Sequence, residues 1–319
     1  MKQKVLVTGS IGFIFSNFIR KSLYEKHPYT FASVDKIVRK QYMNSVYANK
    51  NHQFYIGDIT DKHFMDCVFQ LEQPDIVVHG AAETFVDDSI TDPYKFITSN
   101  VVGTQVIVDA CRKHEVKRLL YVSTDEVYGQ LKSETDASWT EESPMNPRNP
   151  YSASKASGEL IVKAASETFG MNYNITRSSN NYGPRQTPEK LIPKVIKSIL
   201  EDQPIPVYGA GQQVRDWTHV FDNCAGILKV LECGGNNETY NISANQEFTN
   251  LEVIYEICKV IGKGTDLIKF VPDRLGHDFR YSIDSSKLKN LGWAPGIKFK
   301  NGIVQAVEWY LDNKYFLSI

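Results

Sequence analysis

Short apolar runs alternate with longer amphipathic stretches along the first half of the chain. We predict strands at 4–8, 31–35, 53–58, 75–81, 118–124 and 172–179, and helices near 12–26, 61–72, 93–114 and 151–169. The strands are apolar on nearly every position, which indicates burial on both faces. Helices between such strands predict an α/β fold, a doubly wound parallel sheet covered by helices.

The rhythm changes after about residue 180, where prolines become frequent and helices are expected near 191–202, 250–262 and 300–313. We predict a first domain from 1–180 plus 217–245, because 217–245 has the pattern of a strand–helix–strand unit that returns to the large sheet. The remaining segments, 181–216 plus 246–319, would form a smaller α/β C-terminal lobe that binds the substrate.

Bulk composition excludes several classes of protein. The 319 residues carry a net charge of −1, with 42 % hydrophobic and 23 % charged residues. This balance argues against a nucleic-acid or membrane-surface partner, since both need a basic excess. Five widely spaced cysteines indicate reduced thiols, and we expect no metal site. Without a signal peptide or an 18-residue apolar run, the chain is expected to be cytoplasmic.

The stretch "TGSIGFIFS" (8–16) has the spacing of a dinucleotide-binding loop with one glycine replaced. It follows a predicted strand and opens a predicted helix, so Gly9 can form the turn and Gly12 can approach a pyrophosphate at the helix N-terminus. Phe15 stands where a third glycine normally allows close helix–strand packing. We therefore predict that Phe15 points away from the pyrophosphate and that the helix lies slightly farther from the sheet.

Asp35 ends the second predicted strand, 23 residues after Gly12. A carboxylate there accepts hydrogen bonds from the adenosine ribose and repels a 2′-phosphate, so the Rossmann-type domain is predicted to bind NAD rather than NADP. Lys36 weakens this preference, and Asp35 and Asp58 could instead be loop caps. The predicted cofactor-binding residues are Gly9, Gly12, Phe13, Ile14, Asp35, Lys36, Asp58, Ile59, Ala81, Ala82, Asn100, Ser123, Tyr151 and Lys155.

Candidate catalytic residues follow in "VSTDEVYG" (122–129) and "NPYSASK" (149–155). The spacing Tyr-x-x-x-Lys occurs four times in the chain, but only Tyr151 opens a helix soon after a Ser-Thr strand end. Lys155 would lie one turn along the same helix face, where its ammonium is expected to lower the tyrosine pKa so that the phenolate can act as a base.

The chain resembles an extended short-chain dehydrogenase/reductase, and within that superfamily it is similar to nucleotide-sugar 4,6-dehydratases. The match extends through "GDITD", "HGAAETFVDDS", "STDEVYG", "YSASK", "SSNNYGPRQTPEKLIP" and "YGAGQQVRDWTHV". By this resemblance, Tyr151 takes the proton of the sugar 4-hydroxyl, Thr124 hydrogen-bonds that oxygen, and Lys155 holds the tyrosine and the nicotinamide ribose. Glu126 would then act as the base at C5, and protonated Asp125 as the acid at the 6-hydroxyl.

The resemblance also implies a set of residues that bind the nucleotide-diphosphate sugar, in which an Arg would bind the diphosphate. They are Thr84, Asn180, Glu189, Lys190, Leu191, Pro206, Tyr208, Arg215, Asn250, Arg274, His277 and Tyr281. The chain departs from the family pattern at Phe85, Asp88, Leu275 and Phe279. These departures spare the catalytic set and affect the expected shape of the sugar pocket.

Two other functions are compatible with these motifs. One is a nucleotide-sugar 4-epimerase or decarboxylase on the same scaffold, although epimerases generally lack the Asp-Glu pair. The other is a non-catalytic NAD-binding scaffold protein. The resemblance further implies a homodimer through the helices near 93–114 and 151–169, and a place in rhamnose-type deoxysugar synthesis. The base stays open between thymidine and uridine, with "VRDWTHV" favouring thymidine.

Overall fold

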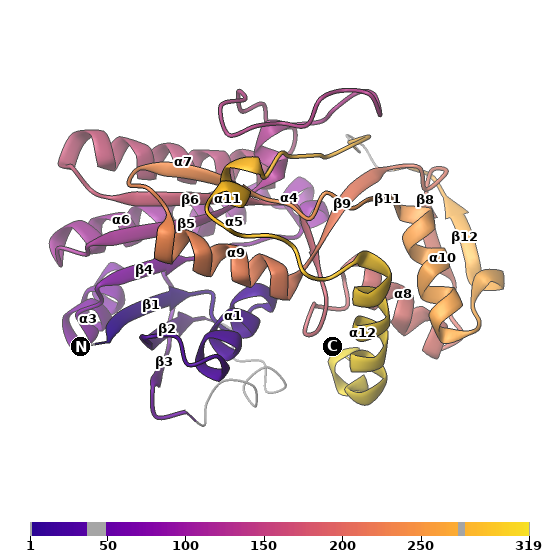
Figure 1. The fold of residues 1–319 in the computed structure, drawn as a ribbon, viewed down its shortest axis with the longest axis horizontal. Helices are drawn as coiled ribbons and strands as arrows, with labels where there is room; N and C mark the ends of the chain where they lie inside the picture. Colours follow the sequence, from indigo (N-terminus) through magenta and orange to yellow (C-terminus); the bar gives the residue numbers. More distant parts are fainter. Residues whose placement is uncertain (1, 37–48, 274–277, 319) are drawn as a thin grey trace.

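A computed structural model describes residues 2–36, 49–273 and 278–318. Its centre is a seven-stranded sheet in which every neighbouring pair of strands is parallel (Figure 1). In spatial order the strands are β10 (Glu238–Ile242), β6 (Tyr173–Ser178), β5 (Arg118–Thr124), β4 (Ile76–His79), β1 (Gln3–Thr8), β2 (Tyr29–Asp35) and β3 (His52–Ile56). The predicted doubly wound fold is confirmed.

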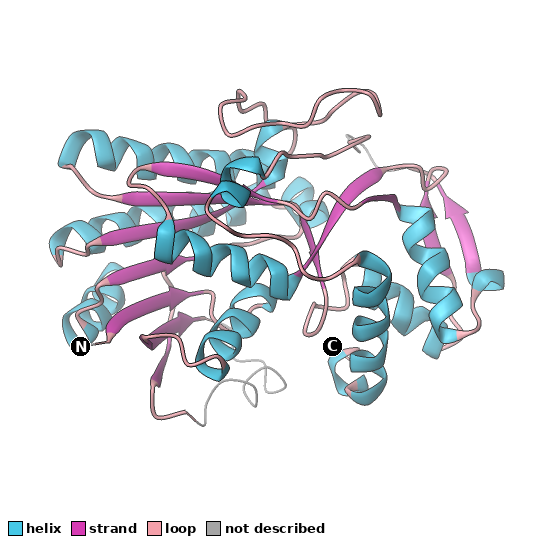
Figure 2. Ribbon diagram, in the orientation of Figure 1, coloured by secondary structure: helices cyan, strands magenta, loops and turns pink. Residues whose placement is uncertain are grey.

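Helices cover both faces of this sheet (Figure 2). Val5 and Val7 of β1 face α1 (Phe13–Tyr24) and α9 (Val220–Cys233), whereas Leu6 between them faces the opposite layer. That layer consists of α3 (Lys62–Glu72), α6 (Gly103–Lys113) and α7 (Pro150–Phe169). Successive side chains of a strand point to opposite faces, so a continuous apolar run supplies both cores.

The helix predicted near 93–114 is divided into three pieces. It comprises α5 (Pro93–Phe96), a π-helical segment η1 (Ile97–Val102) and α6. A separate short helix, α4 (Val86–Thr91), precedes α5. Asp92 lies between the two helices and caps α5, where its side chain accepts a hydrogen bond from the Lys95 backbone N–H at 3.4 Å. A π-helical turn within a helix often lies at a functional site, and η1 carries Asn100.

The smaller lobe has its own apolar core between two short sheets and three helices. The sheets are β11 (Glu247–Thr249), β9 (Val214–His219) and β7 (Asn180–Tyr182) in one, and β12 (Ile268–Val271) with β8 (Ile205–Tyr208) in the other. The helices are α8 (Leu191–Leu200), α10 (Asn250–Ile261) and α12 (Phe299–Asp312). Between Val271 and α12, a short helix α11 (Ser286–Asn290) packs against β10.

The prediction for 217–245 is partly wrong. Its helix α9 and strand β10 return to the large sheet, as expected, but its first strand does not. β9 pairs instead with β7 on one edge and β11 on the other, so neither edge is left to pair with the large sheet. The division of the chain into two domains at 180, 217 and 245 stays a prediction.

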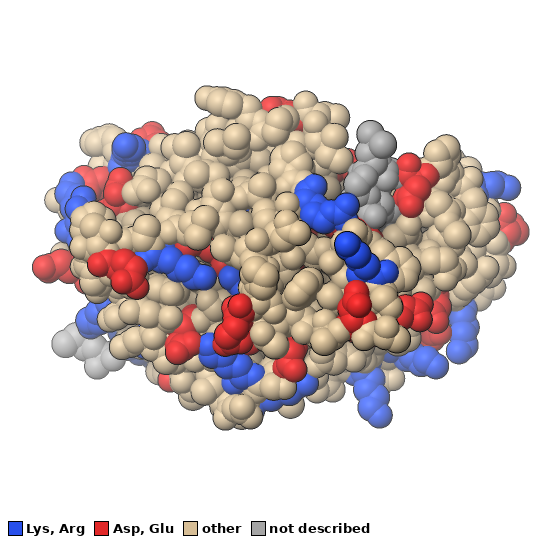
Figure 3. Space-filling model, turned by 90° about the horizontal axis from the view of Figure 1, so that it is seen from above, with Lys and Arg blue, Asp and Glu red and all other residues tan. Residues whose placement is uncertain are grey.

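The order of the strands in the large sheet determines where a ligand site can form. β1 lies between β2 and β4, so the chain crosses to the other half of the sheet after β3. At such a switch point the loops that follow the two central strands diverge, which leaves a crevice at their carboxyl ends. Charged side chains of both signs are interspersed on the face in Figure 3. Within the described residues, no helix has the length and apolar character needed to cross a membrane.

Candidate active site

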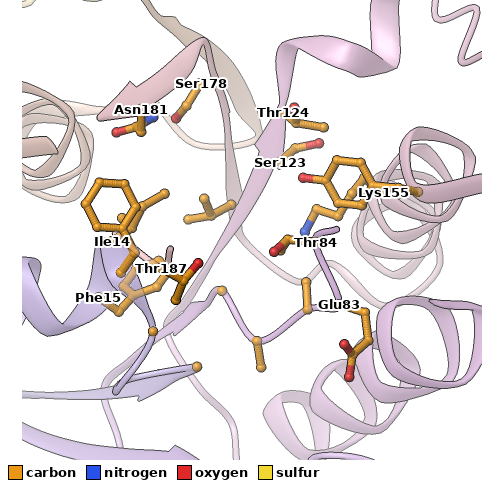
Figure 4. A pocket seen from close by; sticks show the side chains of 18 of the residues that line it. Ile14, Phe15, Glu83, Thr84, Ser123, Thr124, Lys155, Ser178, Asn181 and Thr187 are labelled. Atoms are coloured by element: carbon orange, nitrogen blue, oxygen red, sulfur yellow. The ribbon is translucent and has the colours of Figure 1, made fainter. Parts of the chain in front are cut away.

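A cavity of about 410 Å³ opens at the carboxyl ends of β1, β2, β4 and β5 and extends toward the smaller lobe (Figure 4). It brings together all five predicted catalytic residues. Most predicted cofactor-binding residues line it as well; Asp58 and Asn100 lie beside it. The lining of the cavity includes Gly9, Gly12, Phe13, Ile14, Asp35, Lys36, Ile59, Ala81, Ala82, Ser123, Thr124, Asp125, Glu126, Tyr151 and Lys155.

The loop after β1 is shaped for close contact between backbones. Gly9 has φ of +74°, and a Cβ there would lie 2.8 Å from the Ala81 backbone. Thr8 Oγ1 fixes the facing segment by accepting hydrogen bonds from the N–H groups of Gly80 and Ala81, both at 3.2 Å. Gly12 is the N-cap of α1 and offers no side-chain cap, so amides of the first turn are directed to the cavity.

Phe15 is accommodated by the glycine at position 80. A Cβ on Gly80 would lie 1.8 Å from Phe15 Cε2, so the aromatic ring fills the space above this glycine. The ring is 4 % exposed and packs edge-on against Phe18, with 5.9 Å between ring centroids. Phe15 therefore joins the apolar core under α1 while one side of the ring forms part of the cavity wall.

A row of charged side chains borders the end of the cavity near β2 and β3. Asp35 Oδ2 accepts a hydrogen bond from the Ile11 N–H at 3.1 Å. Lys36 Nζ lies 3.0 Å from Glu83 Oε1 and 3.9 Å from Asp58 Oδ2. Asp58 Oδ1 accepts hydrogen bonds from the backbone N–H and the side chain of Thr60. Both Asp35 and Asp58 thus make the local bonds of loop carboxylates while flanking the predicted ribose position.

The two candidate carboxyl groups follow directly on β5. Thr124 ends the strand and caps the short 3₁₀ helix η2 (Asp125–Tyr128), accepting a hydrogen bond from the Glu126 N–H at 3.3 Å. Asp125 is 3 % exposed, and its Oδ2 has no hydrogen-bond partner among the described residues. Glu126 Oε2 accepts a hydrogen bond from Asn149 Nδ2 at 3.1 Å. The two neighbours therefore have unequal environments.

This inequality separates their proton affinities. Burial, together with the charges of Glu126 and Asp216, raises the pKa of Asp125 well above its ordinary value. Burial also raises the pKa of Glu126, but the hydrogen bond from Asn149 and the charges of Lys190 and Arg215 counteract it. Asp125 is thus the group that retains a proton, whereas Glu126 ionises more readily and is then free to accept one. Their roles as acid and base stay a prediction.

Tyr151 and Lys155 lie on the first turns of α7, whose start is fixed by a capping box. Asn149 Oδ1 accepts from the Ser152 N–H at 2.8 Å, and Ser152 Oγ is 3.2 Å from the Asn149 N–H. Lys155 is 4 % exposed, with Nζ 4.2 Å from the centroid of the Tyr121 ring. The other three Tyr-x-x-x-Lys pairs lie away from the cavity lining.

The expected lowering of the Tyr151 pKa is wrong. Burial, followed by the negative charge of Glu126, raises the pKa of Tyr151, and this outweighs the opposite effect of its hydrogen bond with Thr124. Burial also lowers the pKa of Lys155 to about 7, although the Glu159 charge raises it. Spacing along a helix predicts which residues are neighbours; the cost of ionising them depends on burial.

The predicted substrate residues divide into three groups. Four of them, Thr84, Asn180, Glu189 and Lys190, line the cavity. Two more, Arg215 and Tyr281, lie near Glu126: the charge of Arg215 acts to lower the pKa of Glu126, and the charge of Glu126 acts to raise that of Tyr281. The Arg215 guanidinium lies 4.4 Å from the Tyr281 ring centroid. The remaining described members are outside the lining set: Leu191, Pro206, Tyr208 and Asn250.

Three positions cannot be placed, because Arg274, Leu275 and His277 lie outside the described residues. Of the other departures from the family pattern, Phe85 lies 5.4 Å from Lys190 Nζ, measured to the ring centroid. Lys190 Nζ also donates to the Thr84 carbonyl oxygen at 3.0 Å. A lysine of the smaller lobe therefore contacts the loop after β4, across the mouth of the cavity.

Sequence reasoning missed two residues with clear roles in the geometry. Asn149 orients Glu126 and caps α7; its position before Pro150 and Tyr151 was a helix-start signal that could have identified it. Glu83 lines the cavity and binds Lys36, and its place next to Ala81 and Ala82 was the available clue.

Comparison with known proteins agrees with this geometry. The model of the GDP-mannose 4,6 dehydratase family matches residues 6–306. The chain belongs to this family. A relative from Streptomyces niveus named dTDP-glucose 4,6-dehydratase is 42 % identical, covering 98 % of this chain and 94 % of its own.

Solved structures of other proteins resemble the chain over nearly its whole length. A dTDP-glucose 4,6-dehydratase from Streptomyces venezuelae, solved with NAD bound, has a TM-score of 0.94 at 38 % identity, covering 98 % of both chains. A UDP-glucose 4-epimerase from Thermotoga maritima, solved with UDP-glucose, has a TM-score of 0.90 at 27 % identity, covering 98 % of this chain and 100 % of its own. The predicted resemblance and fold are confirmed.

Proposed function

We propose that this protein is an NAD-dependent nucleotide-sugar 4,6-dehydratase that converts dTDP-glucose or UDP-glucose to the 4-keto-6-deoxy sugar. The observation that carries the proposal is the buried pair Asp125 and Glu126 beside Tyr151 in one cavity. For oxidation at C4, with NAD as the hydride acceptor, the chain needs to supply only the tyrosine and the lysine. An additional acid and base of unequal pKa are what the elimination of water requires.

The residues present fit NAD. Gly9 allows the loop after β1 to approach Ala81, and the α1 N-terminus offers amides and a positive dipole end to a pyrophosphate. Asp35 ends β2, where its carboxylate can accept bonds from a ribose diol. NAD, when bound, supplies the hydride acceptor and later the hydride donor for the sugar carbon.

In the first step Tyr151 would accept the proton of the sugar 4-hydroxyl as hydride leaves C4. Thr124 stands at the end of β5 beside the phenol and would hydrogen-bond the same oxygen. Lys155 would stabilise the phenolate and position the nicotinamide ribose. The ketone formed at C4 acidifies the hydrogen on C5.

In the second step Glu126 would remove the C5 proton while Asp125 donates its proton to the 6-hydroxyl, which leaves as water. The hydrogen bond from Asn149 fixes the Glu126 carboxylate, and the buried Asp125 retains the proton that it must donate. Hydride addition at C6, with return of the proton from Glu126 to C5, then completes the 4-keto-6-deoxy sugar, so that one water is lost and no electrons are consumed overall.

The decisive experiment is to incubate the purified protein and NAD separately with dTDP-glucose, UDP-glucose and UDP-glucuronate and to measure product masses. We expect a product lighter by one water, with dTDP-glucose preferred because the similar dehydratases carry that substrate name. An isomer of unchanged mass would favour an epimerase. Loss of carbon dioxide from UDP-glucuronate would favour a decarboxylase, and absence of both turnover and NAD binding would favour a different class of protein.

We further propose a cytoplasmic homodimer that acts in rhamnose-type deoxysugar synthesis. Exposed apolar side chains on η1 and α7 support the dimer: Val102 is 45 %, Leu160 56 % and Phe169 54 % exposed. Helix faces of this kind pack well against a symmetric copy. Analytical ultracentrifugation tests the dimer, and Leu160→Glu should shift it to a monomer; a monomeric wild type would contradict it.

A further inference from the structure

We propose that Glu83 determines the choice of cofactor by holding Lys36 in an ion pair that keeps its ammonium away from a 2′-phosphate. The inference rests on the proposed function, in which Asp35 binds the adenosine ribose. It resolves a conflict in the sequence, because Asp35 disfavours NADP whereas the cation immediately after it would favour NADP.

The ion pair links two loops that are distant in the sequence. Lys36 leaves the end of β2, and Glu83 follows β4; both side chains line the cavity. Lys36 Nζ is 3.0 Å from Glu83 Oε1 and 3.9 Å from Asp58 Oδ2. The other Glu83 oxygen, Oε2, is 3.1 Å from Lys95 Nζ. Glu83 thus has one cation at each oxygen, and Lys36 has a carboxylate on either side.

Glu83 is held more firmly than an ordinary surface carboxylate. Its backbone N–H donates to Asn100 Oδ1 at 2.8 Å, and Asn100 Nδ2 donates to its carbonyl oxygen at 3.0 Å. Asn100 is 1 % exposed, and the Glu83 side chain is 18 % exposed. Exposed ion pairs are weak in part because forming them costs conformational entropy. A fixed backbone at Glu83 reduces this cost.

Glu83 is charged at neutral pH. Burial raises its pKa, but the hydrogen bonds and charges of Lys36 and Lys95 outweigh burial, so the net direction of the pKa is downward. Around the predicted ribose position, the three carboxylates of Asp35, Asp58 and Glu83 therefore face two ammonium groups, those of Lys36 and Lys95. The local balance is negative, and a 2′-phosphate, itself close to doubly charged, is repelled.

Neutralising Glu83 should release Lys36 for the phosphate. We expect Glu83→Gln to bind NADP about tenfold more tightly than the wild type, with NAD affinity changed by less than about threefold, because a released lysine gains one charge-assisted hydrogen bond. Dissociation constants for NAD and NADP are measured by isothermal titration calorimetry. The gain should shrink at high salt, since the new contact is partly exposed.

Two further variants identify the cation responsible. Lys36→Met combined with Glu83→Gln should lose the gain in NADP affinity. Lys95→Met is the matched control, because it removes the second cation from the same carboxylate and leaves Lys36 bound; it should show no gain. If Glu83→Gln does not fold by circular dichroism, Glu83→Asp shortens the side chain, keeps the charge, and should give a smaller gain through the same release.

The outcomes separate the two proposals. A wild type that binds neither dinucleotide contradicts the proposed function. A wild type that binds NAD, with unchanged NADP affinity in the folded Glu83 variants, overturns the role of Glu83 and leaves the proposed function intact. A gain that persists in the double variant also overturns it, because the released cation would not then be Lys36.

Discussion

Ionisable side chains have opposite environments in the two halves of the cavity. In the half near β2 and β3, charged side chains are partly exposed and paired, as in the row of Asp58, Lys36 and Glu83. In the half near β5 and α7, ionisable groups are buried, and Asp125 Oδ2 lacks a partner among the described residues. One half is arranged to bind, and the other is arranged to exchange protons.

The pKa directions follow this difference. Two lysines lower the pKa of Glu83 against the effect of its burial, so that it remains an anion. Burial raises the pKa of Asp125, Glu126 and Tyr151 and lowers that of Lys155 to about 7. Identical residue types therefore have different chemistry within one cavity, because solvent access and partners differ.

The strongest test of the reacting half is the loss of one carboxyl group. Glu126→Gln keeps the shape and the Asn149 contact but cannot accept a proton. We expect the dehydration rate to fall by about 10²- to 10⁴-fold, with NAD affinity unchanged. Rates are measured with dTDP-glucose, and NAD binding by calorimetry.

Glu142→Gln provides the matched control, since this exposed glutamate lies on the loop before α7, outside the cavity lining. It should leave the rate at the wild-type level. If Glu126→Gln turns over normally, the base at C5 is a different residue and the two halves differ less than proposed.

The binding half is tested at Gly9. Gly9→Ala should weaken NAD binding about 100-fold or more, because the alanine must adopt a positive φ and its Cβ meets the Ala81 backbone. Gly170→Ala is the control: Gly170 also has positive φ, +69°, but a Cβ there meets nothing within 4 Å. Gly170→Ala should bind NAD like the wild type, and an unchanged NAD affinity in Gly9→Ala as well would contradict the close approach at Gly9.

The contact between Phe15 and Gly80 is tested by a double-mutant cycle. Gly80→Ala alone should destabilise the fold by about 2 kcal/mol, since its Cβ overlaps the Phe15 ring. Phe15→Ala alone should cost about 3 kcal/mol through the cavity that it leaves. Combined, they should cost less than the sum by about 1 kcal/mol or more. Additive losses in urea denaturation would contradict the coupling.

The smallest expected effect is on stability at different pH values. Asp125 binds its proton more tightly when folded than when unfolded, because burial raises its pKa. Between the ordinary aspartate pKa of about 4 and the raised value, the folded state holds more protons, so the free energy of unfolding falls as pH rises.

Asp125→Asn removes this dependence. We expect the variant to melt about 2 °C or more above the wild type at pH 8, with the difference disappearing near pH 4. Thermal melts followed by circular dichroism at both pH values measure it. A difference in Tm that does not vary with pH would show that Asp125 is not held protonated by the fold.

Much of the architecture could be predicted because it depends on local pattern. Strands such as 118–124 are apolar on both faces, and turns such as that at Gly9 require one residue type. The fate of β9 could not be predicted, because a six-residue strand can pair in either sheet. Its pairing with β7 and β11 is decided by contacts far along the chain.

The sequence by itself determined the parallel sheet, the glycine loop and which residues are the candidates for the reacting groups, since each follows from residue type and short-range spacing. Only the tertiary structure decided how those groups ionise, how Phe15 fits over Gly80, and that Glu83 binds Lys36. These properties depend on burial and on partners distant in sequence. Both arise only when the sheet brings the carboxyl ends of β1, β2, β4 and β5 side by side.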